Sequence, residues 1–177
     1  GFEATAAAFC ALSPNNDYLG NLRSLVSLLD ADDPATATVS TYNHCKDRAI
    51  LYLTGTPFLD HAKGPKTRAF YQNIIDPTAW NPVTVDGHIV AAYRDQDLVM
   101  KEAAIGGGEY KVIAETIRYL AMDNALLPNQ LQAVIWFTRK RVKRIKFDPQ
   151  LDVLDMSAGA QKTTFRVEDI KPYTKAR

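Results

Sequence analysis

GGGEYKVIAETIRYLA, residues 106–121, is the stretch that decides the fold class. Its apolar side chains recur at intervals of three and four residues, which places them on one face of an α-helix. They are Tyr110, Ile113, Ala114, Ile117, Leu120 and Ala121. The glycines at its start lack the Lys-Ser/Thr pair of a phosphate-binding loop, so we interpret Gly106-Gly107-Gly108 as a flexible joint. The rest of the stretch predicts the cleanest amphipathic helix in the chain.

Helical spacing extends through most of the remaining chain. Further helices are predicted at residues 2–10, 18–29, 36–53, 58–62, 66–75, 87–93 and 128–138. The apolar positions that carry the first three are Phe2, Ala6, Phe9 and Cys10, then Tyr18, Leu22, Leu25, Val26 and Leu29, then the inward-facing Tyr42, Cys45, Ala49 and Leu53. Only residues 163–167 suggest a strand. We therefore predict an all-α domain over residues 1–146, with an irregular tail over 147–177 that packs on it.

Composition places the chain among ordinary globular proteins. Its 177 residues are 46% apolar and 23% charged, which argues against a disordered tail or a collagen-like repeat. No apolar run approaches the roughly 18 residues of a membrane span, and residues 1–4 do not begin a secretion signal. We expect no membrane partner. The two cysteines, Cys10 and Cys45, are expected to be free thiols in the cytoplasm.

Charge is distributed unevenly along the chain. Residues 1–60 hold three basic and seven acidic side chains, a net of −4, whereas residues 61–177 hold 18 and 13, a net of +5. The densest basic cluster is Arg139, Lys140, Arg141, Lys143, Arg144 and Lys146. Such a cluster can bind nucleic-acid phosphates, or it can be the solvated end of a helix, where cations suit the dipole. On the charge run alone, the second interpretation is favoured.

Lys66 and Asp86 are the candidate catalytic pair. Lys66 follows Gly64-Pro65 at the expected start of a helix, where the helix dipole repels an ammonium, and partial burial would further favour the neutral, nucleophilic amine. Asp86 opens the next helix, where its carboxylate could stabilise positive charge on a sugar or transfer a proton. Each also has an ordinary interpretation: Lys66 as an exposed first-turn residue and Asp86 as a helix N-cap.

Four segments, in order, carry a family resemblance. They are LSPNND at 12–17 followed by Asn21, YNHCK at 42–46, GPKT at 64–67 and VDGH at 85–88. This order resembles the helix-hairpin-helix DNA glycosylases of the endonuclease III superfamily, and the resemblance spans most of residues 2–141. It implies a two-lobed helical fold with a helix-hairpin-helix-like element. The chain is short and has no four-cysteine cluster, so it resembles a divergent, phage-type branch without iron–sulfur.

The resemblance implies a function in DNA repair by base excision. The enzyme would bind double-stranded DNA as a monomer without a cofactor, flip a damaged or modified base, and cleave its N-glycosidic bond as a hydrolase, with an added lyase activity. Lys66 would form a Schiff base with the deoxyribose C1′, and Asp86 would activate the nucleophile and stabilise the transition state. If Lys66 is not the nucleophile, Asp86 could assist attack by water.

The remaining site residues are assigned to DNA and to the base. The residues expected to contact DNA are Lys63, Gly64, Thr67, Asn15, Asn16, Arg139, Lys140, Arg141 and Lys143. The residues expected to line the pocket for the flipped base are Tyr18, Tyr42 and His88. The hairpin departs from the family pattern because it has one glycine rather than two. No metal site is expected, since the histidines at 44, 61 and 88 lie 17 and 27 residues apart.

Two other functions stay open. One is a transferase on the same scaffold that modifies an unusual flipped pyrimidine in DNA without cutting its glycosidic bond. The other is a non-catalytic DNA-binding or protein-inhibiting module that keeps the helical scaffold.

Overall fold

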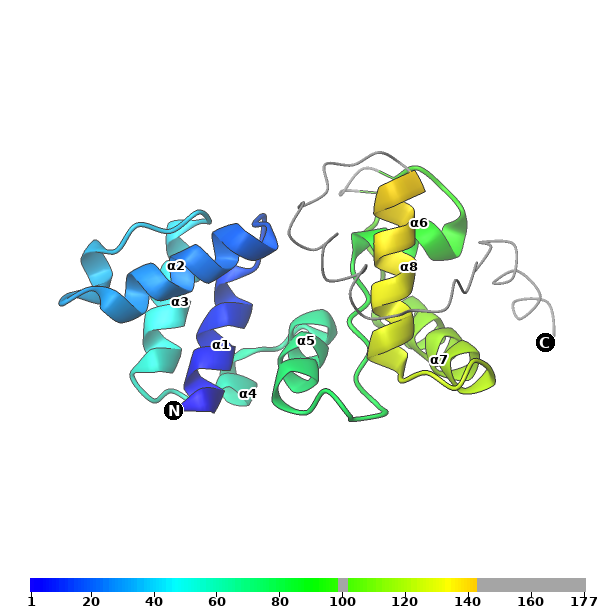
Figure 1. Cartoon of the computed structure of the whole chain (residues 1–177), viewed down its shortest axis with the longest axis horizontal. Coiled ribbons are helices and arrows are strands. Elements are labelled where there is room, and N and C mark those ends of the chain that lie inside the picture. The colour runs from blue at the N-terminus through cyan, green and yellow to red at the C-terminus, as the bar shows by residue number, and fades with distance from the viewer. Residues whose placement is uncertain (99–101, 143–177) are drawn as a thin grey trace, which may run out of the picture. The chain divides into compact units, whose positions relative to one another are not determined.

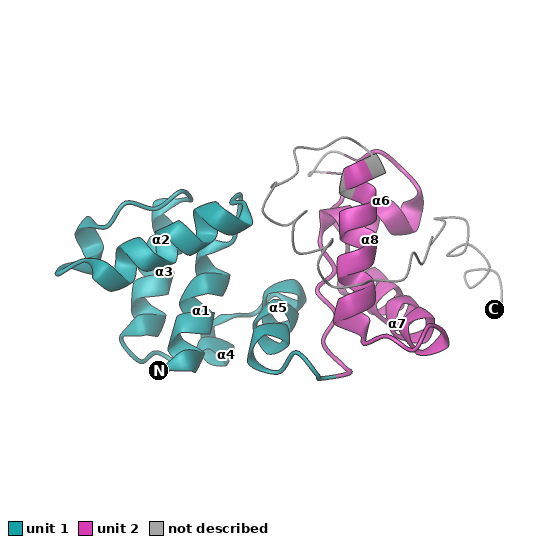
Figure 2. Cartoon of the chain, in the orientation of Figure 1, with its two compact units in different colours: residues 1–79 teal, residues 80–177 magenta. Residues whose placement is uncertain are grey.

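The computed structural model describes residues 1–98 and 102–142, and every regular element among them is a helix (Figure 1). They form eight α-helices and one short 3-10 helix, with no strand among them, which confirms the predicted all-α class. The chain divides into two compact units, residues 1–79 and 80–177 (Figure 2). The expected strand at 163–167 and the expected tail at 147–177 lie outside the described residues. Within the described ranges, no helix has the length and apolar content needed to cross a membrane.

The first unit is built around α1. Its elements are α1 (Phe2–Leu12), α2 (Tyr18–Asp30), η1 (Pro34–Thr36), α3 (Asn43–Leu53), α4 (Phe58–His61) and α5 (Pro65–Ile75). Helix α1 packs against α2, α3 and α5. Its buried face is mostly alanine, from Ala6 to Ala8 and at Ala11, so neighbouring helices can approach it closely. Cys10 and Cys45 are buried in this unit as free thiols, as the sequence predicts.

The third helix begins later than predicted. It starts at Asn43 rather than residue 36, because residues 34–36 form η1 and the segment after them is extended. The Lys46 Nζ donates hydrogen bonds to the carbonyl oxygens of Ala35 (2.7 Å) and Ala37 (3.2 Å), which fixes that segment. Tyr42, predicted to face inward, precedes α3 and is 52% exposed. Phe2 is likewise exposed, because it lies in the first turn of α1.

The second unit holds α6 (Gly87–Arg94), α7 (Gly107–Asp123) and α8 (Pro128–Val142). Helix α8 packs against both α6 and α7. The buried core comprises Val83, Val85, Ile89, Val90, Ile113, Ala114, Ile117, Leu120, Ala121 and Leu131, so the stripe that predicted α7 forms much of it. The prediction of a flexible joint at residues 106–108 is wrong. Gly107 and Gly108 belong to the first turn of α7, and Gly106 is its N-cap.

Candidate functional site

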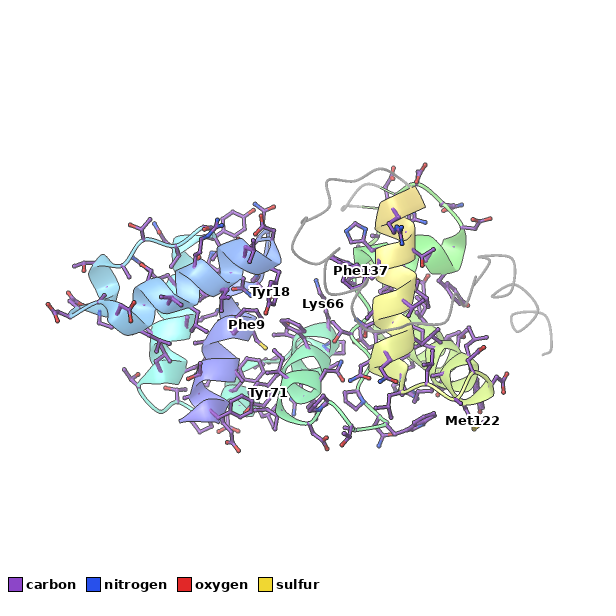
Figure 3. All side chains as sticks on the ribbon, viewed as in Figure 1. Phe9, Tyr18, Lys66, Tyr71, Met122 and Phe137 are labelled. Carbon is purple, nitrogen blue, oxygen red and sulfur yellow. The ribbon has the colours of Figure 1, made fainter. Side chains whose placement is uncertain are left out.

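Lys66 is the second residue of α5. Proline suits the first position of a helix because its backbone nitrogen needs no partner there, and Gly64-Pro65 starts α5 in this way. The Lys66 side chain is exposed, so the partial burial expected for it is not found. Figure 3 shows the side chain at the beginning of α5. Its amine is therefore open to solvent and to a ligand.

Three aromatic rings extend from the same part of the first unit. Phe70 lies one helical turn after Lys66, and residues four apart share a helix face. The Phe70 ring contacts Phe9 of α1, with ring centroids 6.2 Å apart, and Phe9 contacts Tyr18 of α2 edge-on at 6.1 Å. Phe9 and Phe70 are half-buried, whereas Tyr18 is exposed. We call Tyr18, Phe9 and Phe70 the aromatic row, and Lys66 lies next to its Phe70 end.

The loop between α1 and α2 supports the Tyr18 end of the row. Asp17 caps α2, since its carboxylate accepts a hydrogen bond from the Gly20 amide at 2.6 Å. The Asn16 Nδ2 donates to the Leu12 carbonyl oxygen at 3.3 Å, and Asn15 adopts a positive φ of 52°. A Cβ at Gly20 would lie 2.4 Å from the Asn16 Oδ1, so a larger residue there would displace the Asn16 side chain. The loop that carries Asn15 and Asn16 thus has a defined shape.

Residues 40–44 lie against this loop. The Thr41 hydroxyl donates to the Pro14 carbonyl oxygen at 2.6 Å, and the Ser40 amide donates to the Ser24 hydroxyl at 2.9 Å. The exposed Tyr42 and His44 rings stack with centroids 5.5 Å apart. The structure therefore brings together the segments that hold Asn15, Asn16, Tyr18 and Tyr42, which were assigned to DNA contact and to the base pocket.

A short connection precedes Lys66. Helix α4 has only four residues, and Ala62 to Gly64 join it to α5. Lys63 and Gly64 are exposed, and Thr67 is half-buried. The nearest atom to a Cβ at Gly64 would be the Thr67 Oγ1 at 3.8 Å, an ordinary contact, so the turn does not demand glycine. Lys63 and Lys66 are thus two exposed amines three residues apart.

Asp86 belongs to the second unit and is half-buried. Its Oδ1 accepts a hydrogen bond from the Ile89 amide at 2.9 Å, so it caps α6, as the ordinary interpretation anticipated. The buried extended segment before it is held by Tyr110, whose hydroxyl donates to the Val83 carbonyl oxygen (2.7 Å) and accepts from the Val85 amide (3.3 Å). Lys66 and Asp86 lie in different units, and their meeting at one nucleotide stays a prediction.

Two other assigned residues of the second unit, His88 and Arg139, have partners within it. The half-buried His88 contacts Trp136 edge-on, with ring centroids 5.9 Å apart. The Arg139 guanidinium donates to the Gln96 carbonyl oxygen and pairs with Asp97 at 3.4 Å, and its assignment to DNA stays a prediction. Arg141 is exposed on α8, Lys140 also lies on α8, and Lys143 lies outside the described residues.

Sequence reasoning missed several residues that shape these segments. Phe9 and Phe70 were assigned only to helix faces, although the spacing of Lys66 and Phe70 could have indicated their shared face. Tyr110 was assigned only to the apolar stripe of its helix, and no local signal indicates that its hydroxyl holds residues 83–85. In the described parts of both units, no group of three or more His, Cys, Asp or Glu could hold a metal ion.

Comparison with known proteins yields one finding. No curated protein and no solved structure matches the chain. The model of a family of unknown function, DUF7178, matches residues 1–143. Since this match covers well over half of the sequence, the chain belongs to the family of unknown function DUF7178.

Proposed function

We propose that this protein is a DNA glycosylase that flips a damaged or modified base and cleaves its N-glycosidic bond, with Lys66 as the attacking amine. The observation that supports this most is the exposed Lys66 one helical turn from Phe70, at the end of the aromatic row. An amine that reacts with a sugar must be reachable by a nucleotide, and Lys66 meets that condition.

The aromatic row suits an unstacked base. Bases stack on aromatic side chains with about 1–3 kcal/mol per base, and this contact accepts any base because each has a π-face. Tyr18 offers an exposed ring, and Phe9 and Phe70 continue the row from it. The exposed Lys63 supplies positive charge for the adjacent phosphates, which contribute affinity independent of sequence.

In the proposed reaction, the neutral Lys66 amine attacks C1′ of the flipped nucleotide while the bond from C1′ to the base breaks. The bonding electron pair leaves with the base, which takes up a proton. The bond from C1′ to the ring oxygen O4′ then breaks, the proton lost by the amine passes to O4′, and C1′ is left joined to the Lys66 nitrogen as a Schiff base. The Asp86 carboxylate stabilises the positive charge that develops on the sugar. Water then hydrolyses the Schiff base, or elimination at the neighbouring phosphate cuts the strand.

Mass spectrometry of duplex oligonucleotides carrying assorted damaged or modified bases tests this proposal. We expect free base from the wild-type protein and loss of that product in Lys66→Ala and Asp86→Asn, with DNA affinity kept within about threefold. Base release that survives Lys66→Ala but not Asp86→Asn would assign the attack to water instead. A heavier nucleoside with its glycosidic bond intact would identify the transferase and contradict glycosylase activity.

A non-catalytic DNA-binding module is the second candidate. The observation that favours it is the hydrogen bond from Ile89 to Asp86, because a carboxylate that caps a helix has a structural role without any chemistry. This candidate predicts that DNA binds through the first unit and that no substrate releases a base. Loss of binding in Lys63→Ala together with Lys66→Ala, with no product from any oligonucleotide, would favour it over the enzyme.

A further inference from the structure

Helix α2 has an apolar face on its outer side. Leu22, Val26 and Leu29 are spaced by four and three residues, so they form one line along the helix. They are 39%, 46% and 51% exposed. We call these three residues the α2 stripe. A line of large aliphatic side chains in water is typical of a surface that binds another protein segment.

The orientation of α2 is fixed by its inner face. Asn21 and Ser24 are buried there, and the Asn21 Nδ2 donates to the Phe9 carbonyl oxygen at 3.1 Å. The Ser24 hydroxyl accepts the Ser40 amide at 2.9 Å. Turning the helix to bury the α2 stripe would break both hydrogen bonds and leave buried polar groups without partners, which is costly. The stripe therefore stays on the outside of the first unit.

Acidic side chains border the C-terminal end of the α2 stripe. Asp30 ends α2, and Asp32 and Asp33 follow it; all three are exposed. Within the described part of the chain, no ion pair involves any of them. The one basic residue on α2 is Arg23, which lies about two helical turns before Asp30. The stripe thus combines an apolar line with negative charge at one end.

We propose that the α2 stripe binds a basic amphipathic helix of a partner protein. The apolar face of such a helix would cover Leu22, Val26 and Leu29, and its Lys or Arg side chains would meet Asp30 and Asp32. A second copy of the chain is the competing occupant, and the test below distinguishes it. A nucleic acid fits poorly because the end of the stripe is negative. Leu22 lies one helical turn after Tyr18 of the aromatic row, so the stripe begins beside that row and extends away from it along α2.

The test uses the full-length protein and a fluorescein-labelled 18-residue peptide as the probe. The peptide has leucines spaced by three and four residues and lysines elsewhere, and a peptide of the same composition without a helical face is the control. We expect saturable binding of the first peptide by fluorescence anisotropy. Leu22→Ser with Val26→Ser should weaken it at least tenfold, while Val112→Ser, an exposed position on α7, should leave it unchanged.

Further measurements test the role of the acidic side chains and the identity of the occupant. Asp30→Asn with Asp32→Asn should weaken binding about threefold or more and reduce its salt dependence. Circular dichroism should show unchanged helicity in all variants, since the altered side chains are exposed. Equal binding of the control peptide, equal loss in Val112→Ser, or no loss in the α2 variants would overturn the proposal. So would dimerisation in sedimentation that Leu22→Ser with Val26→Ser abolishes, because a second copy would then be the occupant.

Discussion

Asp86 allows its structural and chemical roles to be separated by two substitutions. Asparagine keeps a side-chain oxygen for the Ile89 amide, whereas alanine removes it. We expect Asp86→Ala to lower the free energy of unfolding by about 1 kcal/mol and Asp86→Asn by only a few tenths. Urea unfolding followed by circular dichroism measures both. Equal losses in the two variants would show that the cap is unimportant, and Asp86→Asn could then not serve as the folded variant without the carboxylate.

The Cys10 thiol makes the free energy of unfolding depend on pH in the alkaline range. Burial raises the pKa of its thiol from 9.0 to about 12. Between these values the folded state keeps a proton that the unfolded state releases, so the free energy of unfolding falls by up to about 1.4 kcal/mol per pH unit. Below pH 9 both states hold the proton, so ionisation of the Cys10 thiol removes no stability there. Burial also raises the pKa values of Tyr52, Tyr71 and Tyr110, which act in the same direction.

The Cys10 contribution is measured as a difference between two proteins. We expect the wild type to lose more stability than Cys10→Ala when the pH rises from 8 to 10.5. The Tyr110 contribution is common to both proteins, and the pKa values of Tyr52 and Tyr71 are raised less without the Cys10 charge, which adds to the difference in the same direction. Urea unfolding at the two pH values provides the comparison. If the two proteins lose stability in parallel, the Cys10 thiol ionises alike in the folded and unfolded states and the assignment fails.

At the residue level, sequence reasoning located the amine but not its surroundings. The exposed first-turn position of Lys66 follows from Gly64-Pro65, which start the helix locally. Its neighbours Phe9 and Tyr18 come from two other helices and reach Phe70 only through the packing of α1 on α2 and α5. Arg139 was assigned to DNA from its charge alone, and the sequence has no signal that Gln96 and Asp97 engage it.

At the scale of the elements, the loop that leads into α2 has its shape partly because Gly20 has no side chain. A methyl group at Gly20 would displace the Asn16 side chain and break its hydrogen bond to Leu12. We expect Gly20→Ala to cost up to about 1 kcal/mol of stability, because the Asn16 side chain must move and lose its hydrogen bond to Leu12. Gly108→Ala is the matched control, because Gly108 also lies in the first turn of a helix and a Cβ there meets nothing within 4 Å. Thermal unfolding of both variants that shows equal losses would contradict the described loop.

Helix faces and boundaries were predicted unequally well. The α7 stripe was predicted correctly because one apolar face alternates with a charged one. In α2 the spacing predicts a helix, but apolar residues occur on both sides of it. The inner side buries Leu25 and Leu28 and also carries the hydrogen bonds of Asn21 and Ser24, which the apolar spacing does not indicate. The start of α3 was placed too early because Lys46, through Ala35 and Ala37, holds the preceding segment from outside its own local sequence.

At the scale of the whole molecule, the residues that the structure describes form two hydrophobic cores, one in each unit. Leu28 belongs to the first and Leu131 to the second, and both are almost fully buried. We expect Leu28→Ala and Leu131→Ala each to destabilise its own unit by about 2–5 kcal/mol. Hydrogen exchange followed by mass spectrometry should then show faster exchange in residues 1–79 for the first variant, and in the described part of residues 80–142 for the second. Faster exchange throughout both units from either substitution would show that they unfold as one.

Borohydride trapping tests the central claim, that the exposed Lys66 amine reacts with a nucleotide sugar, most directly. The full-length protein is mixed with duplexes that carry assorted damaged or modified bases, and sodium borohydride reduces any Schiff base to a stable bond. We predict a covalent protein–DNA complex with at least one duplex, kept in Lys63→Ala and absent in Lys66→Ala. A complex that persists in Lys66→Ala, or no complex with any duplex that releases its base, would contradict the assignment of Lys66 as the nucleophile.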